Sequence, residues 1–201
     1  MTASTAERPA RTRWRVVDIV VASVLGAACS AIFIAWNAGS VVPTELLKPL
    51  LPGVQGLVNG PWLIAGPLAG LVVRKPGAAL YAEFLAAVIE LAVFPVYGPL
   101  TLLSGAAQGL GAEVVLAVLL YRSWGPAAAL LAGAGAGVAE SVVDLLTYYP
   151  GSAPTFAVVY AITTIVSGAV FGLVAWALVR GLAATGVLDR FAAGRSARRL
   201  V

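Results

Sequence analysis

Six long apolar stretches follow one another along the chain, separated by prolines, glycines and charged residues. A helix rises about 1.5 Å per residue, so about 20 mainly apolar residues cross the ~30 Å hydrocarbon layer of a bilayer. The separators are typical of loops at the membrane surface. The pattern predicts an all-α integral membrane protein with six transmembrane helices at Val16–Trp36, Val54–Val73, Gly77–Phe94, Thr101–Tyr121, Pro126–Tyr148 and Thr155–Arg180.

The positions of the basic residues predict how these helices are oriented. Cytoplasmic loops are enriched in Lys and Arg, and an even number of spans places both termini on the same side. With six spans, every one of the 13 Lys and Arg residues except Lys48 lies on the side of the termini. Five or seven spans would separate the two basic ends. We therefore expect both termini in the cytoplasm, with residues 1–13 as a disordered tail, 14–181 as the six-helix membrane domain and 182–201 as a basic tail.

The composition supports a membrane protein and argues against an enzyme. Hydrophobic residues make up 60% of the chain and charged residues 11%, with a mean hydropathy of +0.94, whereas soluble domains contain about 25% charged residues. The chain has no His, and its single Cys29 lies in an apolar stretch that we interpret as a retained span. Phosphate-loop, nucleophile-elbow and zinc-protease motifs are absent from the sequence. We expect no catalysis, no cofactor, no metal site and no nucleic-acid partner.

Five acidic residues within the predicted spans are candidates for function, because charged side chains in lipid are costly. No Lys or Arg lies deep in a span to pair with them. Glu90, Glu140 and Asp144 fall in the outer third of the membrane, and the last two share a helix face because they are four residues apart. Glu83 is nearer the cytoplasm, and Glu113 is near the middle. The outer three are suited to a cationic or hydrogen-bond-donating ligand; the alternative is a protonated carboxyl bonded to a neighbouring helix.

Aromatic and amide side chains occur at the same depth as the outer acids. Each aromatic residue on its own is typical of the interfacial belt of membrane proteins. Next to acids, aromatic rings are also suited to binding a flat or cationic ligand by stacking and cation–π contacts. The candidate ligand-binding residues are Glu90, Glu140, Asp144, Trp36, Asn37, Trp62, Tyr97, Gln108 and Tyr148.

Small residues recur every four positions on the first predicted helix. Ala27, Ala31 and Ala35 form one row, and a second row begins at Ala22 and includes Gly26. Rows of this kind let another helix approach closely. The sequence leaves two alternatives open, which are packing within the bundle and an interface with another subunit. We take Ala27, Ala31 and Ala35 as the candidate contact with a partner helix.

Four segments stand out by their sequence and their order: Trp14–Val20 (WRVVDIV), Gly60–Gly70 (GPWLIAGPLAG), Arg74–Ala79 (RKPGAA) and Gln108–Glu113 (QGLGAE). They resemble the YkoE family, whose members are substrate-binding S components of energy-coupling factor (ECF) transporters for thiamine or its hydroxymethylpyrimidine precursor. The resemblance covers about residues 14–180. It implies a six-helix S component that captures the vitamin outside, associates with a membrane coupling subunit and two cytoplasmic ATPases, and topples in the membrane to release its cargo.

The leading hypothesis is therefore a vitamin-binding S component in the plasma membrane of a bacterium. One alternative is a proton- or cation-coupled secondary carrier of a small organic solute, with Glu83, Glu113 and Glu140 as a proton relay. The chain lacks the inverted repeat that is typical of many such carriers. The other alternative is a structural or assembly protein of the membrane. The sequence does not distinguish thiamine from hydroxymethylpyrimidine.

Overall fold

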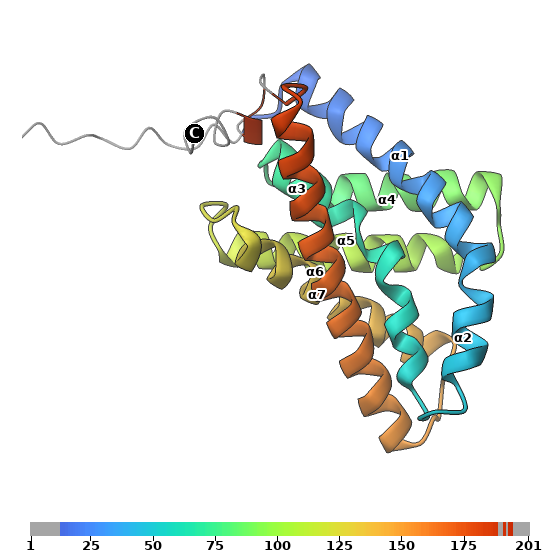
Figure 1. The fold of residues 1–201 in the computed structure, drawn as a ribbon. Helices are drawn as coiled ribbons and strands as arrows, with labels where there is room; N and C mark the ends of the chain where they lie inside the picture. The colour runs from blue at the N-terminus through green and yellow to red at the C-terminus, as the bar shows by residue number, and fades with distance from the viewer. Residues whose placement is uncertain (1–12, 189–190, 192, 195–201) are drawn as a thin grey trace, which may run out of the picture.

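The computed structural model describes residues 13–188, 191, 193 and 194, so the predicted tails lie largely outside the described residues. Within this part of the chain the fold is entirely helical (Figure 1). The beginning of the first helix and the end of the last lie at the same end of the bundle. The helices are α1 (Val16–Gly39), α2 (Val41–Leu47), the 3-10 helix η1 (Val54–Leu63), α3 (Ala65–Val73), α4 (Ala78–Val93), α5 (Leu100–Val118), α6 (Pro126–Thr147) and α7 (Pro154–Ala184).

The outer surface of the bundle is apolar, as lipid requires. Val24, Val114 and Val158 are each more than half exposed, and an extended surface of this kind is unfavourable in water. Among the described residues, α1, η1 with α3, α5, α6 and α7 are long and apolar enough to cross a membrane. The protein is therefore a multi-pass membrane protein. α4 has 16 residues, about 24 Å of helix, and is shorter than a typical span, so the six-span topology stays a prediction.

The second predicted span is not one continuous α-helix. Its first half is η1, which contains Pro61, and α3 begins only after Ile64. Proline has no N–H to donate, and its ring obstructs the preceding turn, so regular α-helical hydrogen bonding is interrupted. The break allows η1 to turn Gln55 and Asn59 toward the interior of the bundle.

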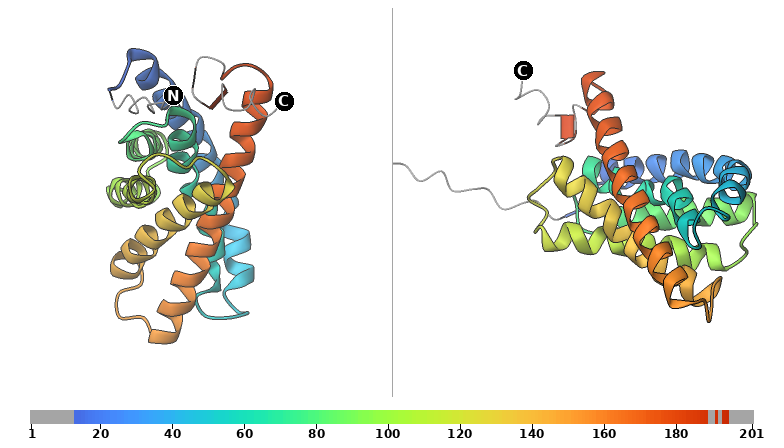
Figure 2. Two further views of the ribbon diagram at one scale, coloured as in Figure 1. Left: turned by 90° about the vertical axis from the view of Figure 1, so that its left-hand side faces the viewer. Right: turned by 60° about the horizontal axis from the view of Figure 1, so that its bottom comes forward.

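Glycines bring α5, α6 and α7 into backbone contact. A Cβ atom placed on Gly133 of α6 would lie 2.1 Å from the carbonyl oxygen of Gly168 in α7. One placed on Gly111 of α5 would lie 2.2 Å from the carbonyl oxygen of Gly135 in α6. Only glycine permits these close approaches. Figure 2 shows α6 crossing α7. The crossings fix the position of α6, which carries two of the outer acids.

The two rows of small residues on α1 have different surroundings. The row that includes Gly26 is buried, and a Cβ atom on Gly26 would lie 2.9 Å from the carbonyl oxygen of Ala82 in α4. Internal packing therefore explains this row. Ala27, Ala31 and Ala35 are exposed on the outside of the bundle. Their role as a contact with a partner helix stays a prediction.

Two acids near the ends of helices have structural roles. Glu113, which the sequence analysis placed near the middle of the membrane, lies in the last two turns of α5. It accepts hydrogen bonds from the backbone N–H of Gly77 (2.7 Å) and from the Tyr121 hydroxyl (2.7 Å), and so compensates N–H groups that the first turn of α4 leaves unpaired. Asp18, which the sequence did not single out, is fully buried and forms an ion pair with Arg15 at 2.8 Å.

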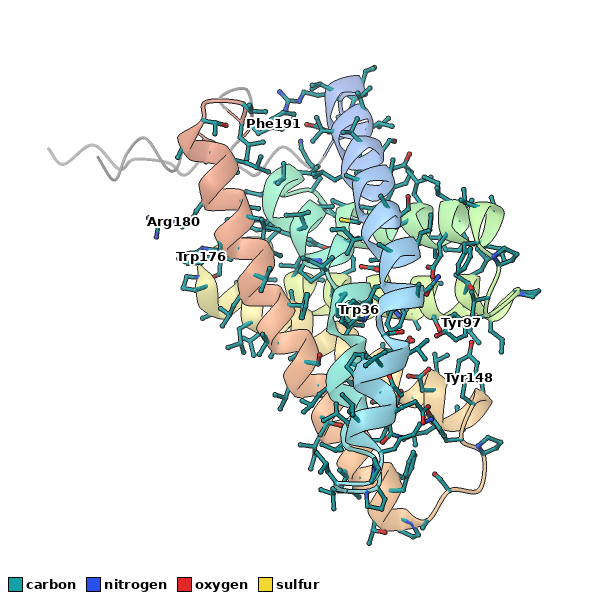
Figure 3. All side chains as sticks on the ribbon, turned by 45° about the vertical axis from the view of Figure 1, so that its right-hand side comes forward. Trp36, Tyr97, Tyr148, Trp176, Arg180 and Phe191 are labelled. Atoms are coloured by element: carbon teal, nitrogen blue, oxygen red, sulfur yellow. The ribbon has the colours of Figure 1, made fainter. Side chains whose placement is uncertain are left out.

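The last helix is longer than the predicted sixth span, because α7 ends at Ala184 and not at Arg180. Beyond it, Leu188, Phe191 and Ala193 are buried against the apolar core. Phe191 lies between the end of α7 and the start of α1 (Figure 3). Part of the predicted C-terminal tail therefore packs on the same end of the bundle as the start of α1.

Candidate ligand-binding site

The three outer acids face a cavity of about 360 Å³ between η1, α4, α5, α6 and α7. Ligand pockets typically measure ~300–1,000 Å³, so the cavity has room for a small organic molecule. It is lined by Phe33, Ser40, Thr44, Gln55, Val58, Asn59, Trp62, Ala87, Glu90, Tyr97, Thr101, Ser104, Gly105, Gln108, Glu140, Asp144, Tyr148, Tyr149 and Tyr160.

Most of the predicted ligand-binding residues line this cavity, but Trp36 and Asn37 do not. Trp36 donates its indole N–H to the carbonyl oxygen of Val58 over 2.9 Å and packs edge-on against Trp62. Asn37 donates its amide N–H to Glu90 over 2.8 Å. Both residues therefore support the wall from behind. The residues that line the cavity as predicted are Glu90, Glu140, Asp144, Trp62, Tyr97, Gln108 and Tyr148.

The three acids of the cavity differ in their hydrogen-bond partners. Asp144 accepts hydrogen bonds from the Tyr160 hydroxyl (2.6 Å) and the Asn59 amide (3.2 Å). Glu90 accepts a hydrogen bond from the amide of Asn37 on α1. Glu140 is only 8% exposed, yet its Oε2 atom has no partner among the described residues. A buried acceptor without a donor is costly. Glu140 therefore offers the acceptor that a ligand can satisfy.

The charged side chains that line the cavity are all acidic. Three carboxyl groups face the cavity, and within the described part of the chain no Lys or Arg lines it. A fourth acid, Glu83, is fully buried but does not line the cavity; its carboxyl group accepts a hydrogen bond from the backbone N–H of Gly66 at the start of α3. The lining therefore favours a cation or a ligand rich in N–H donors.

Three aromatic rings line the cavity in a continuous series. The ring centroids of Trp62 and Tyr97 are 6.3 Å apart, and those of Tyr97 and Tyr148 are 5.9 Å apart, with both pairs edge-to-face. Tyr97 lies in the loop between α4 and α5, and Figure 3 shows it beside Tyr148 at one edge of the bundle. Burial raises the pKa of Tyr97, so its ring stays a neutral phenol. Such rings suit stacking and cation–π contacts.

Several lining residues were not among the predicted ligand-binding residues. Asn59 donates to Tyr160 over 2.8 Å as well as to Asp144, so it links η1, α6 and α7. A polar amide in an apolar stretch is a signal in the sequence, and on that ground Asn59 is a possible hydrogen-bond donor, although it is not among the nine candidate ligand-binding residues. Ser104 and Thr101 give a weaker signal, because hydroxyl groups in membrane helices often bond to their own backbone. Apolar lining residues such as Phe33 give none.

The sequence matches a curated relative over almost its full length. The YkoE protein of Bacillus subtilis (strain 168), named as a candidate HMP/thiamine permease, is 30% identical over 188 residues, which are 92% of this chain and 93% of the relative. The chain belongs to the YkoE family. A family model described as an ABC-type cobalt transport system, permease component, also matches residues 17–139.

The fold of this YkoE-family protein matches a solved transporter subunit. A crystal structure described as an S-component of an ECF transporter gives a TM-score of 0.84 at 29% sequence identity, covering 93% of this chain and 94% of that chain. The predicted S-component fold and the predicted family are thus confirmed. The chain is a substrate-binding transport subunit and not an enzyme.

Proposed function

We propose that this YkoE-family protein captures thiamine or its hydroxymethylpyrimidine precursor from outside the cell, as the S component of an ECF importer in a bacterial plasma membrane. The name of the Bacillus subtilis relative supports this class of ligand, since it mentions both HMP and thiamine. The acidic and aromatic lining of the cavity supports it independently.

The observation that carries this proposal is that Glu140 lines the cavity while its buried Oε2 atom has no hydrogen-bond donor among the described residues. Thiamine contains an aminopyrimidine whose N–H groups donate to a carboxylate, and a thiazolium cation that is attracted to acids and aromatic faces. Glu140 accepts hydrogen bonds from these N–H groups, and the aromatic rings of Trp62 and Tyr97 stack against the ligand. Hydroxymethylpyrimidine offers the same N–H donors without the permanent charge.

The donor chemistry of the chain favours an organic ligand over a transition-metal ion such as cobalt. Imidazole and thiolate groups are the usual soft and intermediate ligands of such ions. The chain has no His, and Cys29 is buried on α1 and does not line the cavity. The remaining candidate ligands are carboxylates, which also serve an organic cation.

A groove on the outside of the bundle supports the assembly with a coupling subunit. Ala31 and Ala35 of α1, Pro61 of η1 and Phe171 of α7 line an apolar depression next to Trp36. Small side chains at its floor let a partner helix approach the α1 backbone. The membrane coupling subunit packs here, and two cytoplasmic ATPases, which bind the coupling subunit, supply the energy that this chain cannot.

The test of the ligand is calorimetric titration of the purified chain in detergent with thiamine and, separately, with hydroxymethylpyrimidine. The proposal expects saturable binding of at least one of them with one site per chain. An absence of binding heat and of thermal stabilisation with both compounds contradicts it.

A further inference from the structure

The cavity is lined by two carboxyl groups that lie on one face of α6. Glu140 and Asp144 are four residues apart on α6, so they lie one turn apart on the same side. Both are less than a tenth exposed, and both line the cavity. Like charges at this separation repel one another, and a low-dielectric interior strengthens the repulsion.

The fixed donors around the cavity compensate some of this charge but not all of it. Asp144 receives the Tyr160 hydroxyl and the Asn59 amide, whereas the Oε2 atom of Glu140 receives no donor from the described residues. A carboxylate in this position is desolvated and has no cationic partner in the cavity lining, and Gln108 and Ser104 donate to Glu140 while its Oε2 atom stays without a donor, so the charged form is unfavourable. A protonated carboxyl at the same position is neutral and avoids the penalty.

No basic group near the pair offers an alternative to the proton. The helices packed around Glu140 contribute acids from α4 and α6, hydroxyl and amide groups from η1 and α5, and phenols from α7 and the outer loops. Within the described residues, none of the cavity lining is Lys or Arg. The titratable groups that face the pair or lie beneath it are Glu83, Glu90, Tyr97, Tyr148, Tyr149 and Tyr160.

We infer that the empty cavity holds a proton on the Glu140–Asp144 pair and that a cationic ligand enters in exchange for this proton. On binding, the O–H bond of the protonated carboxyl breaks, and the proton leaves to the external water. The carboxylate that remains pairs with the positive charge of the ligand and accepts its N–H bond. No electron is transferred, and the net charge of the pair is the same in both states, because one proton or one ligand cation compensates one of its two carboxylates. The inference rests on the proposed function in that thiamine serves as the cation.

The exchange is measured by titrating the purified chain with thiamine in two buffers of different ionisation enthalpy, such as phosphate and Tris. The difference in binding heat gives the number of protons released. We expect about one proton per bound thiamine near neutral pH, and a dissociation constant that falls by up to about tenfold per pH unit as the pH rises from mildly acidic to mildly basic. Binding with the same heat in both buffers, and with a constant affinity over this range, overturns the inference.

Two variants and one second ligand locate the proton. Glu140→Gln removes the pair, so thiamine binding to this variant, tested at higher protein concentration, releases no proton and its affinity no longer depends on pH. The matched control Glu45→Gln changes an exposed acid on α2 outside the cavity, and it keeps the proton release of the wild type. Full proton release by Glu140→Gln contradicts the assignment to this pair.

Hydroxymethylpyrimidine carries no permanent charge, so its binding releases no proton. An equal release with this neutral compound shows that burial of any ligand expels the proton, and it contradicts exchange against a cation. Failure of the wild-type chain to bind thiamine at all is a different result, since it removes the proposed ligand, whereas binding without proton release removes only this inference.

Discussion

Replacing Glu140 by Gln tests the acid whose buried Oε2 atom has no hydrogen-bond donor among the described residues. Gln keeps the length and shape of the side chain but removes its negative charge. In the proposed binding mode, Glu140 accepts a charge-assisted hydrogen bond from the ligand, which is typically worth ~1.5–3 kcal/mol. Since ~1.4 kcal/mol corresponds to a tenfold change, the dissociation constant for thiamine rises by about 10- to 150-fold.

The assay is calorimetric titration of thiamine into purified wild-type and variant chains in the same detergent. Glu45→Gln is the matched control, because this exposed acid on α2 pairs with Lys48 outside the cavity, and we expect it to keep wild-type affinity. Glu90→Gln and Asp144→Asn complete the set. Unchanged dissociation constants in all three cavity variants refute the reasoning that places the ligand among these acids.

Four further predictions concern the wall, the outer face, the helix crossings and the topology. Trp36→Ala weakens thiamine binding by less than Glu140→Gln, by about 0.5–1.5 kcal/mol in calorimetry, because it removes the edge-to-face contact that holds Trp62 in the wall; a larger loss contradicts an indirect role. Ala31→Leu blocks uptake in cells but leaves the affinity of the purified chain intact, and lost affinity with normal assembly shows that this face packs internally. Gly133→Ala lowers the free energy of unfolding by about 1–3 kcal/mol or more and so lowers the thermal melting temperature. An unchanged melting temperature contradicts the backbone contact with α7. In a background without the native cysteine, a membrane-impermeant thiol reagent labels Ser152→Cys in sealed cells but not Arg122→Cys, and labelling of the latter overturns the six-span topology.

The hydrophobic pattern predicted the helices well because lipid imposes one requirement on every span. Apolar length is sufficient to locate a helix when the solvent is a bilayer. The pattern gave no indication of the break at Ile64, because Pro61 and the residues around it keep the stretch apolar while changing its hydrogen bonding. It also ended the last helix at Arg180, although a cationic side chain at a membrane surface does not stop helical geometry and α7 continues to Ala184.

The sequence predicted how deep the site residues lie along their helices, but not which way each side chain points. Glu90, Glu140 and Asp144 were grouped because unpaired acids in lipid are rare, and the structure brings them to one cavity. Trp36 and Asn37 have the right depth, but the rotation of α1 turns them toward neighbouring residues and not into the cavity. Rotation depends on which face packs against which helix, and that information is not local in the sequence.

The most direct test of the central claim is uptake of labelled thiamine into proteoliposomes that contain this chain with its coupling subunit and ATPases. An S component binds its substrate and depends on its partners for energy, so we predict accumulation only when all subunits and ATP are present. The chain alone, with or without a proton gradient, should bind thiamine and transport none. Accumulation by the chain alone that follows a proton gradient would contradict the account and identify a secondary carrier.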